Sequence, residues 1–194
     1  MYKLKITISL IAFFFSSTSL ADTNQKLEKT QEIKILSAIN KHSKEFNQIK
    51  TISFIDYSKK IDEKRFFVVS VKDMNIIYST FVGHAYKSGK SRPTSFSNKK
   101  NSRMTSLGLY RIKKKYKSLV FEHSYRLSGL ESDNSNALSR GIVIHEQGGS
   151  GIVINNNTNK FLNLWTDGCF SFFPEDFKYL QNIFKEGHLL LVVR

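Results

Sequence analysis

The sequence predicts a mixed α/β fold that is predominantly β, with helices at its flanks. Two observations lead to this prediction. From residue 51 onward, short segments rich in β-branched and aromatic residues alternate with polar breaks, which is typical of strands. On either side of the strand-rich region, apolar residues recur at spacings of three and four, which is typical of helices.

The first 21 residues have the order of a secretory signal peptide. Lys3 and Lys5 precede an apolar run over residues 6–15, and Ala21 ends a group of small residues that suits cleavage. The run is shorter than the roughly 20 apolar residues that a membrane-spanning helix needs. We therefore predict an exported protein, periplasmic or secreted, with no membrane span after signal removal. The alternative is a buried or membrane-anchoring N-terminal helix.

The next segment, residues 22–48, is predicted to be a polar leader and a helix. The apolar residues that mark the helix lie on one face and continue to residue 49: Ile35, Ile39, His42, Phe46 and Ile49. We expect this face to dock on the main domain, which covers residues 49–194.

The main domain contains a series of predicted strands and one long loop. Strands are expected over residues 51–57, 65–71, 75–80, 108–112, 141–144, 152–154 and 188–193. The second and third form a hairpin, and residues 148–151 form a turn. Residues 83–106 have no apolar period, and a loop this long in a compact domain is usually functional or disordered.

One helix is predicted after the strands, starting at Pro174. Proline suits the first helical position, and the acidic residues that follow complement the helix dipole. Its buried stripe is Phe177, Leu180, Ile183 and Phe184, and Gly187 ends it.

The charge of the chain is strongly positive. The formal net charge is +14, and it falls to +12 when the signal peptide with its two lysines is removed. Such a surface suits a polyanion, and export makes the anionic cell envelope a better partner than nucleic acid. The alternative is a solvated basic surface that only aids solubility.

The chain has a single cysteine, Cys169, in a protein predicted to enter an oxidising compartment. It has no partner for an internal disulfide. The thiol is therefore buried and inert, paired to another chain, or used in chemistry.

The surroundings of Cys169 favour use in chemistry. It precedes the helix predicted at Pro174, and a helix N-terminus favours the reactive thiolate. Gly168 allows close approach of a substrate, and backbone amides there can stabilise an oxyanion. A thiol nucleophile also needs a base, for which His145 at the end of a predicted strand is the best candidate. His84 and His123 are further candidates, and a lone strand histidine is more often structural.

Other chemistries have weaker signals. The spacing of cysteine and histidine residues matches no zinc site, so we predict no metal and no cofactor. The glycines at 148–151 lack the context of a phosphate-binding loop, and no serine-hydrolase elbow is found. Glu131 and Asp133 lie in a polar loop that would not raise either pKa, which excludes a paired-carboxylate mechanism.

From about Ile49 to the C-terminus, the chain resembles the murein L,D-transpeptidase catalytic-domain family, a branch of the YkuD-like group. The order of many short motifs carries the resemblance. They are Phe54-Ile-Asp-Tyr57, Arg65-Phe-Phe-Val-Val69, Val82-Gly-His-Ala85 with Ser88-Gly89, Ser95-Phe-Ser-Asn98, Ser102, Thr105-Ser-Leu-Gly-Leu-Tyr110, Tyr125-Arg-Leu-Ser-Gly-Leu130, Asn136-Ala137, Ser139-Arg-Gly-Ile-Val-Ile-His145 and Thr166-Asp-Gly-Cys169.

The resemblance implies an L,D-transpeptidase fold in residues 49–194 and catalysis on peptidoglycan stem peptides. Cys169 would be the nucleophile and His145 the base of an acyl-enzyme reaction. The thiolate attacks the third residue of a tetrapeptide stem, expels the terminal D-alanine and passes the acyl group to an amine. Further pocket residues implied by the resemblance are His84, Ser88, Ser95, Ser97, Asn98, Ser106, Gly108 and Arg140. Gly168 is the oxyanion candidate named above, and Asp167 stands where the family often has a second histidine, whose role is lost or falls to Asp167.

The chain departs from the family pattern at three places. Glu146 replaces the usual glycine after the base, Asp167 replaces a frequent histidine, and Phe170-Ser-Phe-Phe173 replaces small or basic residues. Two alternative functions stay open at this point. One is hydrolysis of stem peptides by a carboxypeptidase or endopeptidase. The other is a non-catalytic, basic protein that binds the cell envelope.

Overall fold

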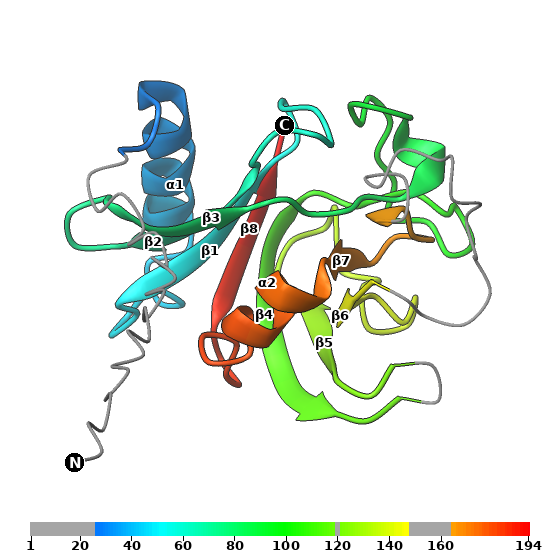
Figure 1. The fold of residues 1–194 in the computed structure, drawn as a ribbon. Helices are drawn as coiled ribbons and strands as arrows, with labels where there is room; N and C mark the ends of the chain where they lie inside the picture. The colour runs from blue at the N-terminus through cyan, green and yellow to red at the C-terminus, as the bar shows by residue number, and fades with distance from the viewer. Residues whose placement is uncertain (1–25, 119–120, 148–163) are drawn as a thin grey trace, which may run out of the picture.

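A single sheet of eight strands forms the centre of the molecule (Figure 1). The structure, a computed structural model, describes residues 26–118, 121–147 and 164–194. The elements in chain order are α1 (Lys29–Lys41), β1 (Thr51–Asp56), β2 (Phe66–Ser70), β3 (Ile76–Thr80), the 3₁₀ turn η1 (Tyr86–Ser88), β4 (Gly108–Tyr116), β5 (Ser124–Gly129), β6 (Val143–Glu146), β7 (Phe170–Phe172), α2 (Pro174–Leu180) and β8 (Leu189–Val193).

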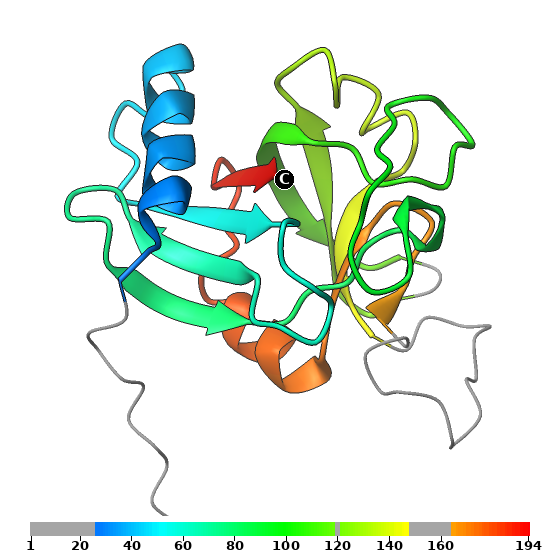
Figure 2. The same cartoon turned by 90° about the horizontal axis from the view of Figure 1, so that it is seen from above.

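The sheet is mixed and strongly curled. Its strand order is β3-β2-β1-β8-β4-β5-β6-β7, so the last strand of the chain lies in the middle of the sheet. β8 pairs parallel to β1 and antiparallel to β4, and β6 pairs parallel to β7. Seen from above, β1–β3 and β4–β7 form two wings that meet at β8 (Figure 2).

Both faces of the central strands are buried, each in its own core. In β1, Phe54 belongs to the core under α1, and its neighbour Ile55 belongs to the core under α2. β8 divides in the same way, with Leu191 in the first core and Leu190 in the second. Successive strand residues point to opposite faces, so two covered faces require continuous apolar runs. This explains the run of five apolar residues over 189–193.

The predicted fold class is confirmed, and most predicted elements are present. The hairpin of β2 and β3 is antiparallel as expected, and α1 docks on the sheet through Ile35 and Ala38. The helix predicted to reach residue 49 instead ends at Lys41, because His42 leaves the helical conformation and turns follow. Phe46 stays buried in the same core, so the apolar stripe persists although the helix stops.

The other differences concern strand limits. β4 runs to Tyr116 instead of residue 112, and β6 begins at Val143 instead of residue 141. The second helix ends at Leu180, and hydrogen-bonded turns continue its buried stripe to Phe184. β5 and β7 were not expected as strands. β5 begins with a serine and β7 has only three residues, so neither has a clear pattern.

Several predictions fall on residues that the structure does not describe. They are the signal peptide over residues 1–21, the turn at 148–151 and the strand at 152–154. In the described part of the chain, neither helix has the length and apolarity needed to cross a membrane.

Candidate active site

Cys169 and His145 lie on neighbouring segments at the β5–β7 end of the sheet. β6 and β7 are parallel neighbours in which His145 pairs with Ser171 and Ile144 pairs with Phe170. Ile144 and Phe170 belong to the core under α2. Because side chains alternate along a strand, His145 and Ser171 lie on the opposite face. Cys169 directly precedes β7, so the predicted nucleophile and base lie on neighbouring segments of the chain.

His145 is held in one tautomer. Its Nδ1 lies 2.7 Å from the backbone oxygen of Glu146, and a carbonyl oxygen can only accept a hydrogen bond. Nδ1 therefore carries the proton, which leaves Nε2 as the acceptor. The side chain is 7% exposed, and burial lowers the pKa of His145 to about 4. The imidazole is neutral at pH 7 and can accept a proton at Nε2.

The thiol of Cys169 is also neutral. Burial raises the pKa of Cys169 to about 11, and the Val143 N–H and the Arg140 charge lower it by less. The expectation of a thiolate favoured by a helix N-terminus is wrong, because β7 separates Cys169 from the start of α2. Sγ lies 3.8 Å from the backbone oxygen of Gly141. Among the described residues, no hydrogen bond joins Sγ to His145.

The backbone before Cys169 is shaped by Thr166 and Gly168. The Gly168 N–H donates to Oγ1 of Thr166 at 3.1 Å, and that hydroxyl donates to the carbonyl oxygen of Cys169 at 2.7 Å. Gly168 has φ +132°, and a Cβ there would lie 2.8 Å from Cδ1 of Ile142. Only glycine fits this turn without strain. Its N–H is already used within the turn.

Arg140 connects the cysteine to the long loop after β3. Its guanidinium donates to the backbone oxygens of Ser97 at 2.8 Å and Met104 at 2.5 Å. It also donates to the hydroxyls of Ser106 at 3.2 Å and Ser102 at 3.3 Å. A Cβ on Gly168 would lie 3.1 Å from Nη2 of Arg140. The structure therefore brings Arg140, Ser97 and Ser106 to the Cys169 turn.

His84 and Ser88 belong to this loop and are fully buried. Nδ1 of His84 accepts from Arg65 at 2.7 Å, and Nε2 donates to the Gly89 oxygen at 2.8 Å. Burial and the Arg65 charge lower the pKa of His84 to about 4. Ser88 accepts from the Thr105 N–H at 2.9 Å. These contacts hold the loop in place. Between the two residues, the Tyr86 N–H donates to the backbone oxygen of Thr166 in the Cys169 turn at 3.0 Å.

The remaining predicted residues are dispersed around the site. Asp167 is exposed and lies 3.9 Å from Nε of Arg103. Ser95 is exposed and bonds the Ser88 oxygen through its N–H. Asn98 bonds the segment over residues 132–136 and does not contact the cysteine turn. Gly108 begins β4 and packs against Asn134 and Glu131.

Three residues near the pair were not predicted from the sequence as site residues. Phe121 stacks on the His145 ring, with centroids 3.9 Å apart and planes at 21°. Ser124 pairs with His145 in β5, and its buried hydroxyl has no hydrogen-bond partner among the described residues. Thr166 organises the cysteine turn. Only Thr166 had a signal, because a hydroxyl two residues before a glycine is common in turns.

Among the described residues, no group of three or more His, Cys, Asp or Glu side chains is arranged to hold a metal ion. The chemistry available at this site is that of a neutral thiol and a neutral imidazole beside an arginine.

The sequence model of the L,D-transpeptidase catalytic domain matches residues 23–193. No curated protein is matched by the chain. Similar solved structures include L,D-transpeptidases from Mycobacterium smegmatis (12% identity, TM-score 0.45, 75% of this chain and 59% of that chain) and Enterococcus faecium (12%, 0.42, 74% and 50%). L,D-transpeptidase 1 of Mycobacterium tuberculosis is similar at 12% identity and TM-score 0.42, over 75% of this chain and 62% of that chain.

The chain thus spans from about half to three-fifths of the length of these solved proteins. The family model covers nearly all of the described residues, including Cys169 and the strand that carries His145. The chain belongs to the L,D-transpeptidase catalytic-domain family.

Proposed function

We propose that this protein is a peptidoglycan L,D-transpeptidase in which Cys169 forms an acyl-enzyme with a tetrapeptide stem and His145 is the base. The observation that carries the proposal is the position of Cys169 directly before β7, the parallel neighbour of the strand that carries His145. The hydrogen bond from His145 Nδ1 to Glu146 supports it further, because it leaves Nε2 as the acceptor.

In the proposed reaction, Sγ attacks the carbonyl carbon of the third stem residue while its proton moves to Nε2. The bond to the terminal D-alanine then breaks, and the imidazolium returns the proton to the leaving amine. A second amine attacks the thioester and restores the thiol. The neutral resting pair fits this scheme, because the proton transfer needs a neutral imidazole and starts from a thiol.

Sγ must turn from the Gly141 oxygen toward His145 before it reacts. Catalytic hydrogen bonds are often long in free enzymes and tighten only in the substrate complex. We propose that substrate binding provides this change. The charge of Arg140, which lowers the pKa of Cys169, favours the developing thiolate once the sulfur is freed.

The positive charge near the site supports a donor substrate with acidic groups and a partner in the anionic cell envelope. Residues 83–103 contain six Lys or Arg residues and no Asp or Glu. Two contacts join this segment to the residues before Cys169. Trp165 Nε1 donates to the Lys90 oxygen at 3.2 Å, and Arg103 pairs with Asp167. Among the described residues, Lys87, Lys90 and Arg92 form no ion pair. We propose export through residues 1–21 as the route to this envelope.

The test is intact mass of the mature protein after incubation with a carbapenem, a β-lactam class that acylates a reactive cysteine of this kind. We expect one adduct on the wild type and none on Cys169→Ala, with an unchanged circular dichroism spectrum. Muropeptide analysis then separates transfer from hydrolysis by the product, a cross-link or a tripeptide. A folded wild type without an adduct would contradict the proposal and favour the non-catalytic envelope-binding function.

A further inference from the structure

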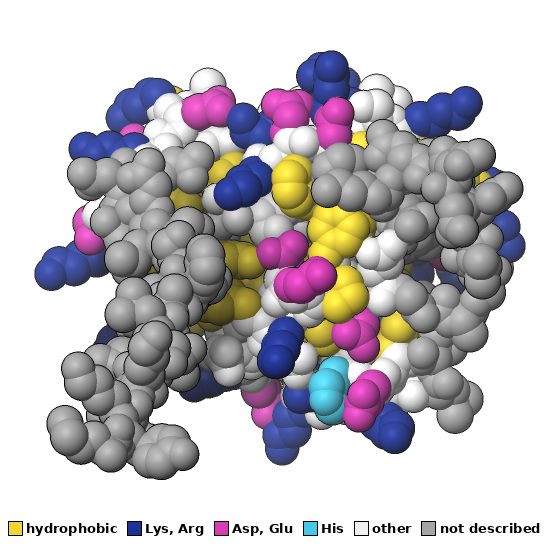
Figure 3. Space-filling view, in the orientation of Figure 1, with side chains coloured by type: hydrophobic (Ala, Val, Ile, Leu, Met, Phe, Trp, Pro, Cys, Tyr) yellow, Lys and Arg dark blue, Asp and Glu magenta, His cyan; other side chains and the backbone are white. Residues whose placement is uncertain are grey.

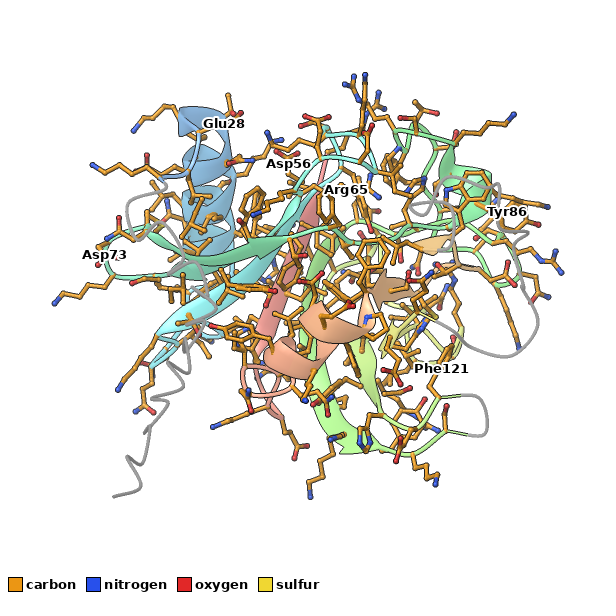
Figure 4. All side chains as sticks on the ribbon, viewed as in Figure 1. Glu28, Asp56, Arg65, Asp73, Tyr86 and Phe121 are labelled. Atoms are coloured by element: carbon orange, nitrogen blue, oxygen red, sulfur yellow. The ribbon has the colours of Figure 1, made fainter. Side chains whose placement is uncertain are left out.

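Phe121 makes the closest aromatic contact of the His145 ring. It lies in the connection between β4 and β5, and its ring is nearly parallel to the imidazole, with centroids 3.9 Å apart. In Figure 4 the labelled Phe121 lies at the β5–β6 end of the sheet, and Tyr86 lies near the opposite edge of the same half of the molecule. Phe121 and the 83–106 loop thus approach the site from different sides.

The backbone of Phe121 is hydrogen-bonded to Ser118. Its N–H donates to the hydroxyl of Ser118 at 2.7 Å, and its carbonyl oxygen accepts from the Ser118 N–H at 3.0 Å. Three residues further on, Ser124 begins β5 and pairs with His145 across the β5–β6 ladder. Phe121 therefore lies between its bonds to Ser118 and β5, which is in fixed register with the strand that carries the imidazole.

The hydrogen bond to Glu146 alone does not fix the imidazole completely. It sets the position of Nδ1 at 2.7 Å, but the ring plane can still tilt about that contact. A ring stacked at 21° resists this tilt, since tilting would drive the imidazole into the phenyl face. The same contact covers one face of the imidazole with apolar surface and excludes water from it.

We infer that Phe121 is a positioning residue for the base: its ring holds the His145 imidazole in the plane that presents Nε2 for the thiol, and shields that ring from water. The inference rests on the proposed function for its catalytic meaning. The stack itself is a property of the fold and can be measured without any reaction.

Few titratable groups face the imidazole. Cys169 directly precedes the neighbouring strand β7, and Ser124 on β5 does not titrate in this range. The side chain of Glu146 points to the other face of β6 by alternation. Glu122 and His123 are the neighbours of Phe121 in the turn, and they are unchanged in the variants below.

The test compares Phe121→Leu with Phe121→Tyr and with Tyr116→Leu. Phe121→Leu removes the aromatic ring and keeps apolar volume, whereas Phe121→Tyr keeps an aromatic ring. The third is a matched control, because Tyr116 lies in the same β4–β5 hairpin but packs on Arg126. The readouts are the pKa of His145 from NMR titration of the imidazole and the pH profile of Cys169 acylation by a carbapenem.

We expect Phe121→Leu to raise the pKa of His145 by about one unit, because water reaches the ring. The acylation rate at pH 7 should fall about 10-fold with little change in half-saturating carbapenem concentration, because a displaced base slows the step without weakening binding. Phe121→Tyr should restore both values, and Tyr116→Leu should match the wild type in both.

Two results would overturn the inference. One is a Phe121→Leu protein with the pKa and rate of the wild type. The other is a loss of rate that Tyr116→Leu shares while the pKa of His145 stays constant, since this would mark a general structural effect. If the wild type is not acylated at all, the proposed function fails, while the NMR comparison still decides whether Phe121 controls the imidazole.

Discussion

The turn before Cys169 combines three constraints on single residues. Gly168 has a positive φ of +132°, Thr166 uses its hydroxyl twice within the turn, and Arg140 packs against Gly168. Each contact sets the position of the sulfur relative to β6. The residues around Cys169 therefore fix the backbone conformation of the turn as well as supplying reactive groups.

Replacing Gly168 with alanine tests whether the conformation of this turn requires glycine. We expect Gly168→Ala to lower the free energy of unfolding by about 2–4 kcal/mol, since backbone strain costs about 1–3 kcal/mol and the added Cβ meets Ile142. It should also slow acylation of Cys169, because the turn must shift.

The control is Gly187→Ala, which has φ +92° and no atom within 4 Å of an added Cβ. It should cost only the backbone strain, about 1–2 kcal/mol, with unchanged acylation. Urea unfolding and intact mass measure both effects. Equal losses of stability in the two variants would contradict the packing argument at Gly168.

At the scale of elements, the sheet has two different parts. In β2, β1 and β8 both faces are buried, under α1 and under α2. At β5–β7 the face toward α2 is apolar, whereas the other carries Ser124, His145 and Ser171 in one row. The candidate active site thus lies where the second core layer ends, and α1 packs on the other part of the sheet.

Truncation on α1 tests this division. Ile35 is fully buried against the sheet, so Ile35→Ala should lower the free energy of unfolding by about 2–5 kcal/mol. Ile33 on the same helix is 54% exposed, and Ile33→Ala should change the free energy of unfolding by about 0.5 kcal/mol or less. In the folded state both variants should keep wild-type acylation of Cys169. A selective loss of acylation in folded Ile35→Ala would show that α1 shapes the site.

At the scale of the whole molecule, charge is unevenly distributed between surface and interior. Lys and Arg side chains line much of the outline in Figure 3, while hydrophobic side chains gather in the middle of that face. Inside, Arg65 is fully buried with no carboxylate in ion-pair range among the described residues, and backbone oxygens and His84 satisfy its donors. His84, His145 and His188 are each held neutral by burial, which lowers the pKa of each to about 4.

These three histidines make stability depend on pH. The unfolded chain binds their protons near pH 6.5, whereas the folded protein does not bind them until about pH 4. Their contribution is complete above pH 6.5 and is lost as pH falls toward 4. Each proton contributes about 1.4 kcal/mol per pH unit, so the three give a slope of about 4 kcal/mol per unit within this window.

Urea unfolding at pH 7, 6 and 5 measures this slope. His188 contacts the hydroxyl of Ser53 at 2.9 Å, and His188→Gln keeps a polar group there that does not titrate. That variant should lose about one third of the slope. A free energy of unfolding that is constant from pH 7 to 5 would contradict the neutral, buried state of these side chains.

The sequence by itself determined the elements whose patterns are local. Continuous apolar runs identified β2 and β8, Pro174 marked the start of α2, and the ordered motifs identified the family. The roles of Cys169 and His145 stay a proposal, although the parallel pairing of β6 and β7 brings their segments side by side. These signals are local because side-chain alternation and helix starts depend on neighbouring residues.

Tertiary structure alone decided the strand order, the extent of α1 and the state of the thiol. No local pattern places β8 between β1 and β4, and the three residues of β7 become a strand only because β6 offers a partner. The pKa of Cys169 rises because distant segments bury it, although the chain after it predicted a helix N-terminus and a lowered pKa. Burial and pairing are sums over residues far apart in the chain, and only the folded molecule brings those residues together.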